Sequence, residues 1–186
     1  SIATGLEPAH SGIVGNNWYD RQQNVEVYAG GPAAQRSPLL LEGTALGDWM
    51  KAADPRSKVF TASLKDRSAI MLGGQGADGV FWYDGRYGSW ASSSYYGRAL
   101  PDWLVDFNQE QRLNRFYGTA WEPLTDERRW AEVDVEHLDT GAFARGFPHV
   151  LGWSNPGPSS VFYERIPTSP WGDWYLAEMA EALIVN

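Results

Sequence analysis

The polar and apolar residues of this chain alternate with a helical period in some segments and with an extended period in others. Across segment 44–54 the apolar side chains fall on one face of a helix: Ala45, Leu46, Trp49, Met50 and Ala53. Thr44 is the predicted N-cap of this helix, and Pro55 is expected to end it. The pattern therefore predicts a helix over this segment.

The next segment, 58–64, predicts a strand. Its alternating positions divide into two faces: Phe60, Ala62 and Leu64 on one, and Val59, Thr61 and Ser63 on the other. Neither face is strongly polar, so we expect cover on both sides, as in a parallel sheet. A short helix over 67–74 follows, and Gly73 and Gly74 are expected to stop it.

Further elements follow from the same patterns. A hairpin is predicted with strands at 79–84 and 89–96. A helix is expected from Pro101, with a break near Asn108 and a buried stripe of Trp103, Leu104 and Phe107. Segment 159–166, SSVFYERI, is predicted as a strand. The last helix, 171–185, is expected to bury one face: Leu176, Met179, Ala180, Leu183 and Ile184.

The remaining segments are less regular. The opening of the chain resembles the end of a helix, and two glycines in GIVGNN (12–17) suggest that the backbone comes close to another part of the chain. Residues 20–43 are interpreted as a surface loop with at most a short edge strand. Helices and strands alternate without internal repeats, which predicts an α/β fold in a single unit covering 1–186.

Composition excludes several classes of protein. The 186 residues carry a formal net charge of -8, which disfavours a nucleic-acid-binding surface. There is no Cys, so disulfides and thiolate zinc sites are excluded. No apolar run is long enough to span a bilayer, so no membrane partner is expected.

The candidate chemistry lies where the strand at 58–64 gives way to a helix. If the segment stays extended, Lys65 and Arg67 face one pocket and Asp66 faces away. Two cations at the start of a helix suit a phosphoryl group, since Arg offers a planar fork and Lys a compact charge. The alternative is a solvated corner that Asp66 partly neutralises.

Four segments of the sequence contain longer motifs: TGLEPAHSGIVGNNWYD, KVFTASLKDRSAIMLGGQGADGVFWYD, SSSYYGRALPDWLVDFN and SPWGDWYLAEMAEALI. Together they resemble the PafA-type alkaline phosphatases of the alkaline phosphatase superfamily, which are related to the type I phosphodiesterases and nucleotide pyrophosphatases. The resemblance is strongest over 1–120 and 168–186. It implies an α/β/α sandwich, with 121–167 as an inserted α+β cap-like region.

The resemblance also implies a site. Asn16, Lys65 and Arg67 correspond to side chains that bind the phosphoryl group, and the Lys and Arg pair favours small phosphate monoesters. Two zinc ions and a Thr or Ser nucleophile are implied for the intact enzyme. The nucleophile and the zinc ligands are expected outside this chain, which by itself would be inactive. The family setting implies a periplasmic or secreted enzyme. One departure is that Ser11 stands where the family tends to have His.

Two other functions stay open. One is a phosphodiesterase or nucleotide pyrophosphatase of the same superfamily, and the other is a non-catalytic Trp-rich binding module for carbohydrate or peptide. Tyr83, Tyr87 and Trp90 could form a stacking platform on the hairpin, but such rings are expected to pair across the strands instead. A metal site is not expected at the acidic stretch Asp134, Glu136, His137 and Asp139, nor at His10 or His149. The serines at 92–94 lack the motif of a serine hydrolase.

Overall fold

A three-stranded sheet lies at the centre of the molecule. The computed structural model describes residues 2–124, 147–152 and 156–186. The strand order is β3 (Phe60–Ser63), β4 (Gly79–Asp84) and β5 (Ser89–Ala91). β3 pairs with β4 in parallel, and β4 pairs with β5 as an antiparallel hairpin. The predicted parallel strand and the predicted hairpin are both confirmed, although β5 ends earlier than expected.

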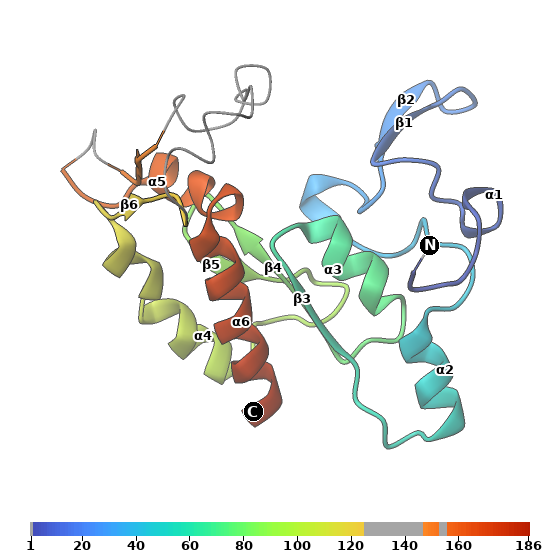
Figure 1. Cartoon of the computed structure of the whole chain (residues 1–186). Coiled ribbons are helices and arrows are strands. Elements are labelled where there is room, and N and C mark those ends of the chain that lie inside the picture. The colour runs from blue at the N-terminus through green and yellow to red at the C-terminus, as the bar shows by residue number, and fades with distance from the viewer. Residues whose placement is uncertain (1, 125–146, 153–155) are drawn as a thin grey trace.

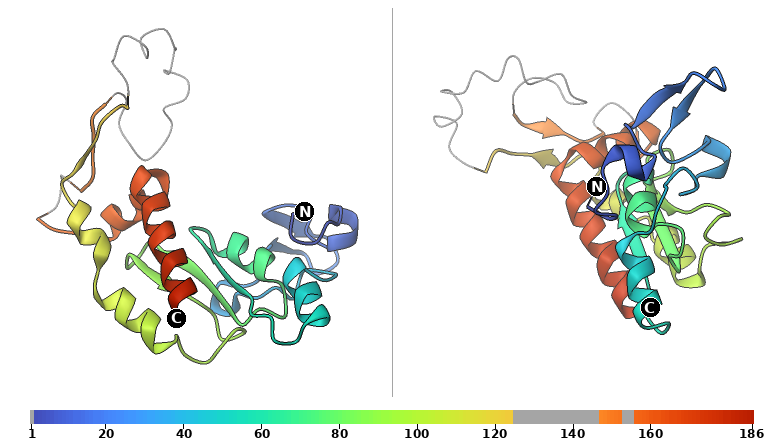
Figure 2. Two further views of the ribbon diagram at one scale, coloured as in Figure 1. Left: turned by 60° about the horizontal axis from the view of Figure 1, so that its bottom comes forward. Right: turned by 90° about the vertical axis from the view of Figure 1, so that its right-hand side faces the viewer.

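Helices cover both faces of this sheet, and the alternation of β4 explains why. Val80 and Trp82 pack with Ala69 and Ile70 of α3 (Asp66–Gly73). Phe81 and Tyr83 point to the other face, where they join the cluster built with α4 (Asp102–Gln109) and α6 (Pro170–Val185). Figures 1 and 2 show the strands between α3 on one side and α4 with α6 on the other. The chain therefore has the α/β class that the sequence predicted.

The aromatic side chains mostly fill the interior. Tyr175 of α6 stacks on Trp90 with ring centroids 5.4 Å apart, and it also contacts Phe107 at 5.7 Å. Tyr83 and Trp90 are partners across the hairpin, and both are buried. Of the three rings considered as a stacking platform, only Tyr87 is exposed, so the preferred prediction of cross-strand pairing is confirmed.

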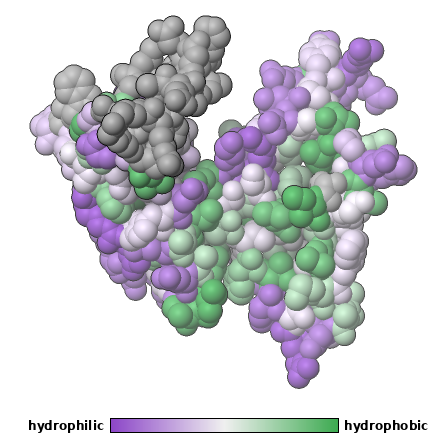
Figure 3. Space-filling model, viewed as in Figure 1, coloured by the Kyte–Doolittle hydropathy of each residue, from purple (hydrophilic) through white to green (hydrophobic). Residues whose placement is uncertain are grey.

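The predicted buried face of α6 is confirmed in part, since Met179 is fully buried and Leu176 and Leu183 pack against the core, whereas Ala180 and Ile184 are exposed. The structure buries Gly172, Tyr175 and Met179, and leaves Ile184 84% exposed. Gly172 lies so close to the preceding turn that a Cβ there would come within 2.6 Å of the backbone oxygen of Ile166. This close approach and the large ring of Tyr175 set the rotation of the helix, and Ile184 and Val185 at its end are left exposed. Figure 3 shows apolar surface over α3 and at this end of α6.

Another sequence prediction was wrong. Segment 159–166 forms α5 (Ser160–Arg165), not a strand, because Phe162 and Ile166 lie four residues apart and are both fully buried on one helical face. A 3-10 turn, η5 (Ile166–Thr168), links it to α6. Residues 20–43 are predicted as a loop with at most a short edge strand. The structure has one short strand here, β2 (Val25–Tyr28), which forms a hairpin with β1 (Asn17–Asp20) and is followed by η1 (Ala33–Gln35).

The helix predicted over 44–54 is α2 (Leu46–Ala53), but its N-cap is Ala45 and not Thr44. The Asp48 carboxylate, in the first turn of the helix, accepts a hydrogen bond from the N-cap N–H of Ala45 at 2.8 Å. The Thr44 hydroxyl instead accepts a hydrogen bond from the Trp49 indole.

The predicted break near Asn108 is confirmed, since α4 ends at Gln109 and η2 (Arg112–Phe116) follows. The Asn108 side chain bonds both the N–H and the C=O of Trp90, at 2.8 and 2.9 Å, and so completes the edge of the sheet. A small sheet of β6 (Ala120–Trp121) and β7 (His149–Val150) lies beyond.

The acidic stretch 134–139 lies outside the described residues, and the extent of the cap-like region stays a prediction. In the described parts of the chain, no helix is long and apolar enough to cross a bilayer.

Asp78 anchors the entry to β3. Its carboxylate accepts the Val59 N–H at 2.8 Å and pairs with Lys51 Nζ at 2.7 Å. Partial burial alone would raise the pKa of Asp78, but these two bonds outweigh it and hold the pKa at about 2. A carboxylate with a lowered pKa stabilises the fold above its unfolded pKa, and this contribution is lost as the pH falls toward the folded value.

We expect Asp78→Asn to lower the free energy of unfolding by about 1 kcal/mol at neutral pH. The difference from the parent should shrink between about pH 4 and pH 2, where the parent carboxylate itself becomes protonated. Urea denaturation at neutral and acidic pH measures this difference. Asp54→Asn is the matched control, because the Asp54 partner Arg56 is 90% exposed and that pair is expected to contribute nothing measurable. An equal loss in both variants would contradict the prediction.

Candidate functional site

A hollow of about 480 Å³ lies between the loop before β1 and the first turns of α3. Residues 13–16 line it on one side, and Arg67, Ser68 and Met71 line it on the other, with Ala29 at the base of the hairpin. Asn16 and Arg67, which are far apart in the sequence, thus share one concave surface. Such a hollow with few polar groups is the usual form of a small-molecule site.

The loop that carries Asn16 is fixed at both ends. At its start, Gly12 ends α1 (Pro8–Ser11) with φ 74°, and a Cβ there would lie 2.8 Å from the backbone oxygen of Leu40. This confirms the close backbone approach that the glycines of GIVGNN suggested. At its end, the Asn16 carbonyl accepts the Ala29 N–H at 2.9 Å and closes the base of the hairpin. The position of Asn16 therefore depends on both the turn and the hairpin.

Ser11, the residue that departs from the family pattern, is part of this support. It is 2% exposed, and its carbonyl accepts the Glu42 N–H at 2.8 Å. The bond ties the end of α1 to the segment before α2. Ser11 therefore holds the loop from inside the fold.

The junction between β3 and α3 places the two cations differently from the extended pattern. β3 ends at Ser63, and Lys65 is the N-cap of α3, the last residue with an extended backbone. Asp66 and Arg67 lie in the first helical turn, so the rule that alternate residues share a face does not apply between Lys65 and Arg67. Of the three residues, only Arg67 lines the hollow, so Asp66 lies outside it as predicted, but Lys65 does not share it with Arg67. The side chains of Asp66 and Arg67 both reach the hydroxyl of Tyr28.

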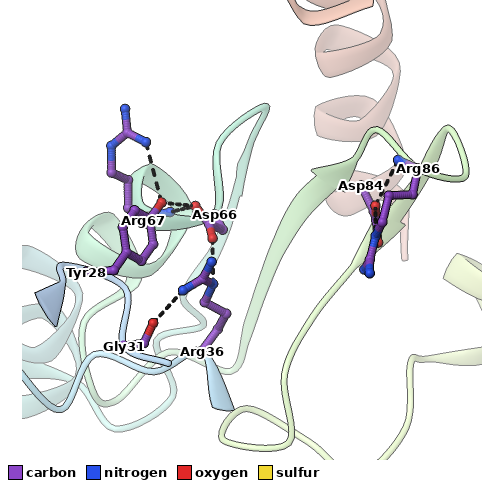
Figure 4. A network of polar contacts seen from close by, with 7 residues as sticks. All are labelled: Tyr28, Gly31, Arg36, Asp66, Arg67, Asp84 and Arg86. Atoms are coloured by element: carbon purple, nitrogen blue, oxygen red, sulfur yellow. Dashed lines mark hydrogen bonds and ion pairs between the residues drawn. The ribbon is translucent and has the colours of Figure 1, made fainter. Parts of the chain in front are cut away.

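Asp66 is held by two residues from the hairpin and the loop after it. Arg36 Nε pairs with one carboxylate oxygen at 2.7 Å, and the Tyr28 hydroxyl donates to the other at 2.5 Å. Figure 4 shows this network, with Arg36 below the carboxylate and the Arg67 side chain extending to the other side of Tyr28. Within the described residues, neither Lys65 nor Arg67 forms a side-chain ion pair with Asp66. The solvated, self-neutralised corner is therefore not what the structure shows.

Tyr28 lies between the carboxylate and the guanidinium of Arg67. Its hydroxyl accepts a hydrogen bond from Arg67 Nη1 at 3.4 Å while it donates to Asp66. Burial and the bond to Asp66 raise the pKa of Tyr28, against a smaller opposite effect of Arg67. The phenol is therefore neutral at physiological pH and acts as the donor that Asp66 requires.

The structure thus brings Asn16 and Arg67 to one hollow. Lys65 is exposed next to it and is not among the residues that line it. Sequence reasoning missed Tyr28 and Arg36. An Arg inside the polar stretch AGGPAAQRSP gives no local sign of its partner, because only the folded hairpin brings it to Asp66.

A second hollow of about 770 Å³ lies beside the network, on the side of η1. Tyr28 and Arg36 form part of its wall, together with Trp18, Leu39 and Tyr95. Its lining is mostly apolar but also includes Asp20, Gln23 and Glu26. None of Asn16, Lys65 and Arg67 is among the residues that line it.

The described residues contain no group of three or more His, Asp or Glu side chains placed to hold a metal ion. The one carboxylate beside Arg67, that of Asp66, is already occupied by Arg36 and Tyr28.

Comparison with known proteins identifies the family. The family model for type I phosphodiesterase / nucleotide pyrophosphatase matches residues 1–154. The chain is 34% identical over 202 residues to alkaline phosphatase PhoV of Synechococcus elongatus, a match that covers 99% of this chain and 36% of that protein. It is 30% identical over 207 residues to alkaline phosphatase PafA of Elizabethkingia meningoseptica, covering 99% and 36%.

Solved structures agree with the sequence matches. A crystal structure of a PafA variant superposes with a TM-score of 0.78 at 28% identity, covering 98% of this chain and 38% of that one. The chain therefore belongs to the type I phosphodiesterase / nucleotide pyrophosphatase family, and its relatives include alkaline phosphatases, as the four sequence blocks predicted. It spans about a third of the length of the curated relatives that it matches.

The turn at Gly12 generates a prediction about the loop that carries Asn16. Gly5 and Gly12 both have positive φ, but a Cβ at Gly5 would meet nothing within 4 Å. We expect Gly5→Ala to cost about 1 kcal/mol of stability, which is the cost of the left-handed backbone. Gly12→Ala should cost more, about 2–3 kcal/mol, because the new methyl also contacts the Leu40 carbonyl. Denaturation of the two variants under the same conditions measures the difference, and equal losses would contradict it.

Proposed function

We propose that this chain supplies the phosphoryl-binding side chains of a phosphate monoester hydrolase, an alkaline phosphatase. The observation that carries the proposal is that Asn16 and Arg67, from separate segments, line one hollow at the start of α3. The substrate is a small phosphate monoester. The intact enzyme is proposed to be periplasmic or secreted, with no nucleic acid or membrane as partner.

The solved PafA variant supports these residue choices. It carries substitutions of a Thr, an Asn, and a Lys and an Arg that are two positions apart. Asn16, Lys65 and Arg67 show the same residue types, with the same spacing between the Lys and the Arg. That agreement in type and spacing favours a shared role in binding the phosphoryl group.

Each side chain has a role that its chemistry allows. The planar fork of Arg67 can donate two parallel hydrogen bonds to phosphoryl oxygens, and the amide of Asn16 donates to a third. Lys65, at the N-cap of α3, adds a compact positive charge that can follow the phosphoryl group. Donors placed in advance stabilise charge that develops during phosphoryl transfer.

The remaining parts of the enzyme are proposed from the family resemblance. Two zinc ions would supply Lewis acidity in the intact enzyme. Their ligands, and the Thr or Ser nucleophile, are proposed to be residues outside this chain, which alone would be inactive.

A phosphodiesterase or nucleotide pyrophosphatase is the second candidate, and the description of the matching family favours it. The pair Lys65 and Arg67 argues for monoesters, because a dianionic phosphoryl group gains more from two cations than a monoanionic diester does. A Trp-rich binding module has less support. Of the tryptophans in the described residues, only Trp49 is strongly exposed.

We expect Arg67→Ala in the full-length enzyme to lower kcat/KM for an aryl phosphate by about 100-fold, which corresponds to roughly 3 kcal/mol for one placed donor. The loss for the methyl diester of the same phenol should be much smaller, because that substrate carries one negative charge fewer. Steady-state kinetics with both substrates give the two ratios. Arg56→Ala, at a 90% exposed side chain, is the control. Comparable rates for Arg67→Ala and the parent would refute the role of Arg67.

A further inference from the structure

Asp66 presents a problem for the proposed phosphate site. It lies between Lys65 and Arg67 in the sequence, and its carboxylate accepts the Arg67 backbone N–H at 2.6 Å. A free carboxylate at this position would attract the neighbouring cations and repel a phosphate dianion. The site therefore needs a means of neutralising Asp66 that does not use Lys65 or Arg67.

Arg36 has the contacts that this task requires. Its Nε pairs with Asp66 at 2.7 Å, its Nη1 donates to the Gly31 carbonyl, and its guanidinium lies 4.2 Å from the centre of the Tyr28 ring. The side chains of Arg36 and Asp66 are only 23% and 19% exposed. The guanidinium is thus fixed from three directions, and the pair is partly shielded from water, which strengthens it relative to a surface ion pair.

Tyr28 completes the separation of Asp66 from Arg67. A phenol has one hydrogen to donate, and here it goes to Asp66. Its oxygen then offers a lone pair to Arg67 Nη1, at 3.4 Å. The polar groups form a chain from Arg36 through Asp66 and Tyr28 to Arg67 (Figure 4). Arg67 therefore meets a neutral hydroxyl instead of the carboxylate.

We propose that Arg36 is a positioning residue of the phosphate site, which neutralises Asp66 so that the charges of Lys65 and Arg67 act on the substrate. This inference rests on the proposed function and adds a reason for selectivity toward dianionic monoesters. The three cations and one carboxylate leave two net positive charges at the junction. Without Arg36 one charge remains, and Asp66 becomes free to pair with Arg67.

The test uses Arg36→Met in the full-length enzyme, which keeps much of the side-chain volume and removes the charge. We expect kcat/KM for an aryl phosphate to fall about 10- to 30-fold, and kcat/KM for its methyl diester to change less than about 3-fold. Competitive inhibition by inorganic phosphate, also a dianion, should weaken by a similar factor. Equal losses for monoester and diester would overturn the proposal.

A double variant separates charge from folding. If Arg36 acts by neutralising Asp66, then Arg36→Met combined with Asp66→Asn should recover monoester activity to within about 3-fold of the parent. A double variant as weak as Arg36→Met alone would overturn the proposal, since it would show that the Asp66 carboxylate is not what lowers activity in Arg36→Met.

If Arg36→Met does not fold, Tyr28→Phe provides the measurement. It removes the hydroxyl between Asp66 and Arg67, and a selective loss of about 3-fold or more for the monoester is expected; an unchanged monoester rate would overturn the proposal.

Arg86→Met is the matched control. Arg86 also pairs with an aspartate, Asp84, at 2.6 Å, but on the β4–β5 turn away from the hollow (Figure 4). No change in either substrate is expected from this variant, and a loss like that of Arg36→Met would count against a specific role of Arg36.

Arg67→Ala distinguishes a failure of the proposed function from a failure of the inference about Arg36. If it does not selectively lower monoester turnover, the proposed function fails. If it does, but Arg36→Met has no effect, only the inference about Arg36 fails. In the Arg67→Ala background, Arg36→Met is expected to cost less than about 2-fold further, because its main target is already absent. A full additional loss would show that Arg36 acts by another route and would overturn the proposal.

Discussion

The parallel pairing of β3 with β4 is the constraint on which the rest of the structure depends. Because both faces of β4 are buried, its alternate side chains require a helical layer on each side, and α3 and α6 provide those layers. Because β3 and β4 are parallel, the chain must return from the end of β3 to the start of β4, and α3 makes this connection. The start of α3 therefore lies at the carboxyl edge of the sheet. This is the edge at which open α/β sheets bind ligands. The position of Arg67 follows from the topology of the sheet.

A second constraint is electrostatic. Lys65, Asp66 and Arg67 are consecutive. In such a run on a surface, the carboxylate would partly neutralise the charges of its two cationic neighbours. Arg36 and Tyr28 come from a separate part of the chain and take up both oxygens of Asp66. The outcome is a local excess of positive charge in a chain whose net charge is -8. Such a local excess of positive charge is what the proposed binding of a small phosphate monoester requires.

The aromatic residues have a mainly structural role in the described parts of the chain. Tyr175, Trp90, Tyr83 and Phe107 form one connected set of rings between the sheet and α4 with α6. This cluster fixes the position of α6 against the hairpin. It lies on the opposite face of the sheet from α3, so the anchoring of the fold and the candidate site use different layers. Substitutions in one layer can therefore be interpreted with little interference from the other.

The sequence by itself determined the elements whose signals are local. The strand over 58–64, the helix stopped by Gly73 and Gly74, the hairpin and the break near Asn108 all follow from period, turn chemistry and glycine placement, and the structure confirms them. The four motif blocks also indicate the family, because they are local stretches of sequence. Sequence pattern failed where long-range packing decides the outcome. It predicts a strand over 159–166, whereas the burial of Phe162 and Ile166 on one face goes with a helix. The rotation of α6 likewise depends on the close approach of Gly172 to Ile166. The candidate site divides in the same way. Lys65, Asp66 and Arg67 are visible as a motif, but the partner of Asp66 was decided by tertiary structure alone, because the charge of Arg36 acts only after a hairpin has folded and brought it within 2.7 Å.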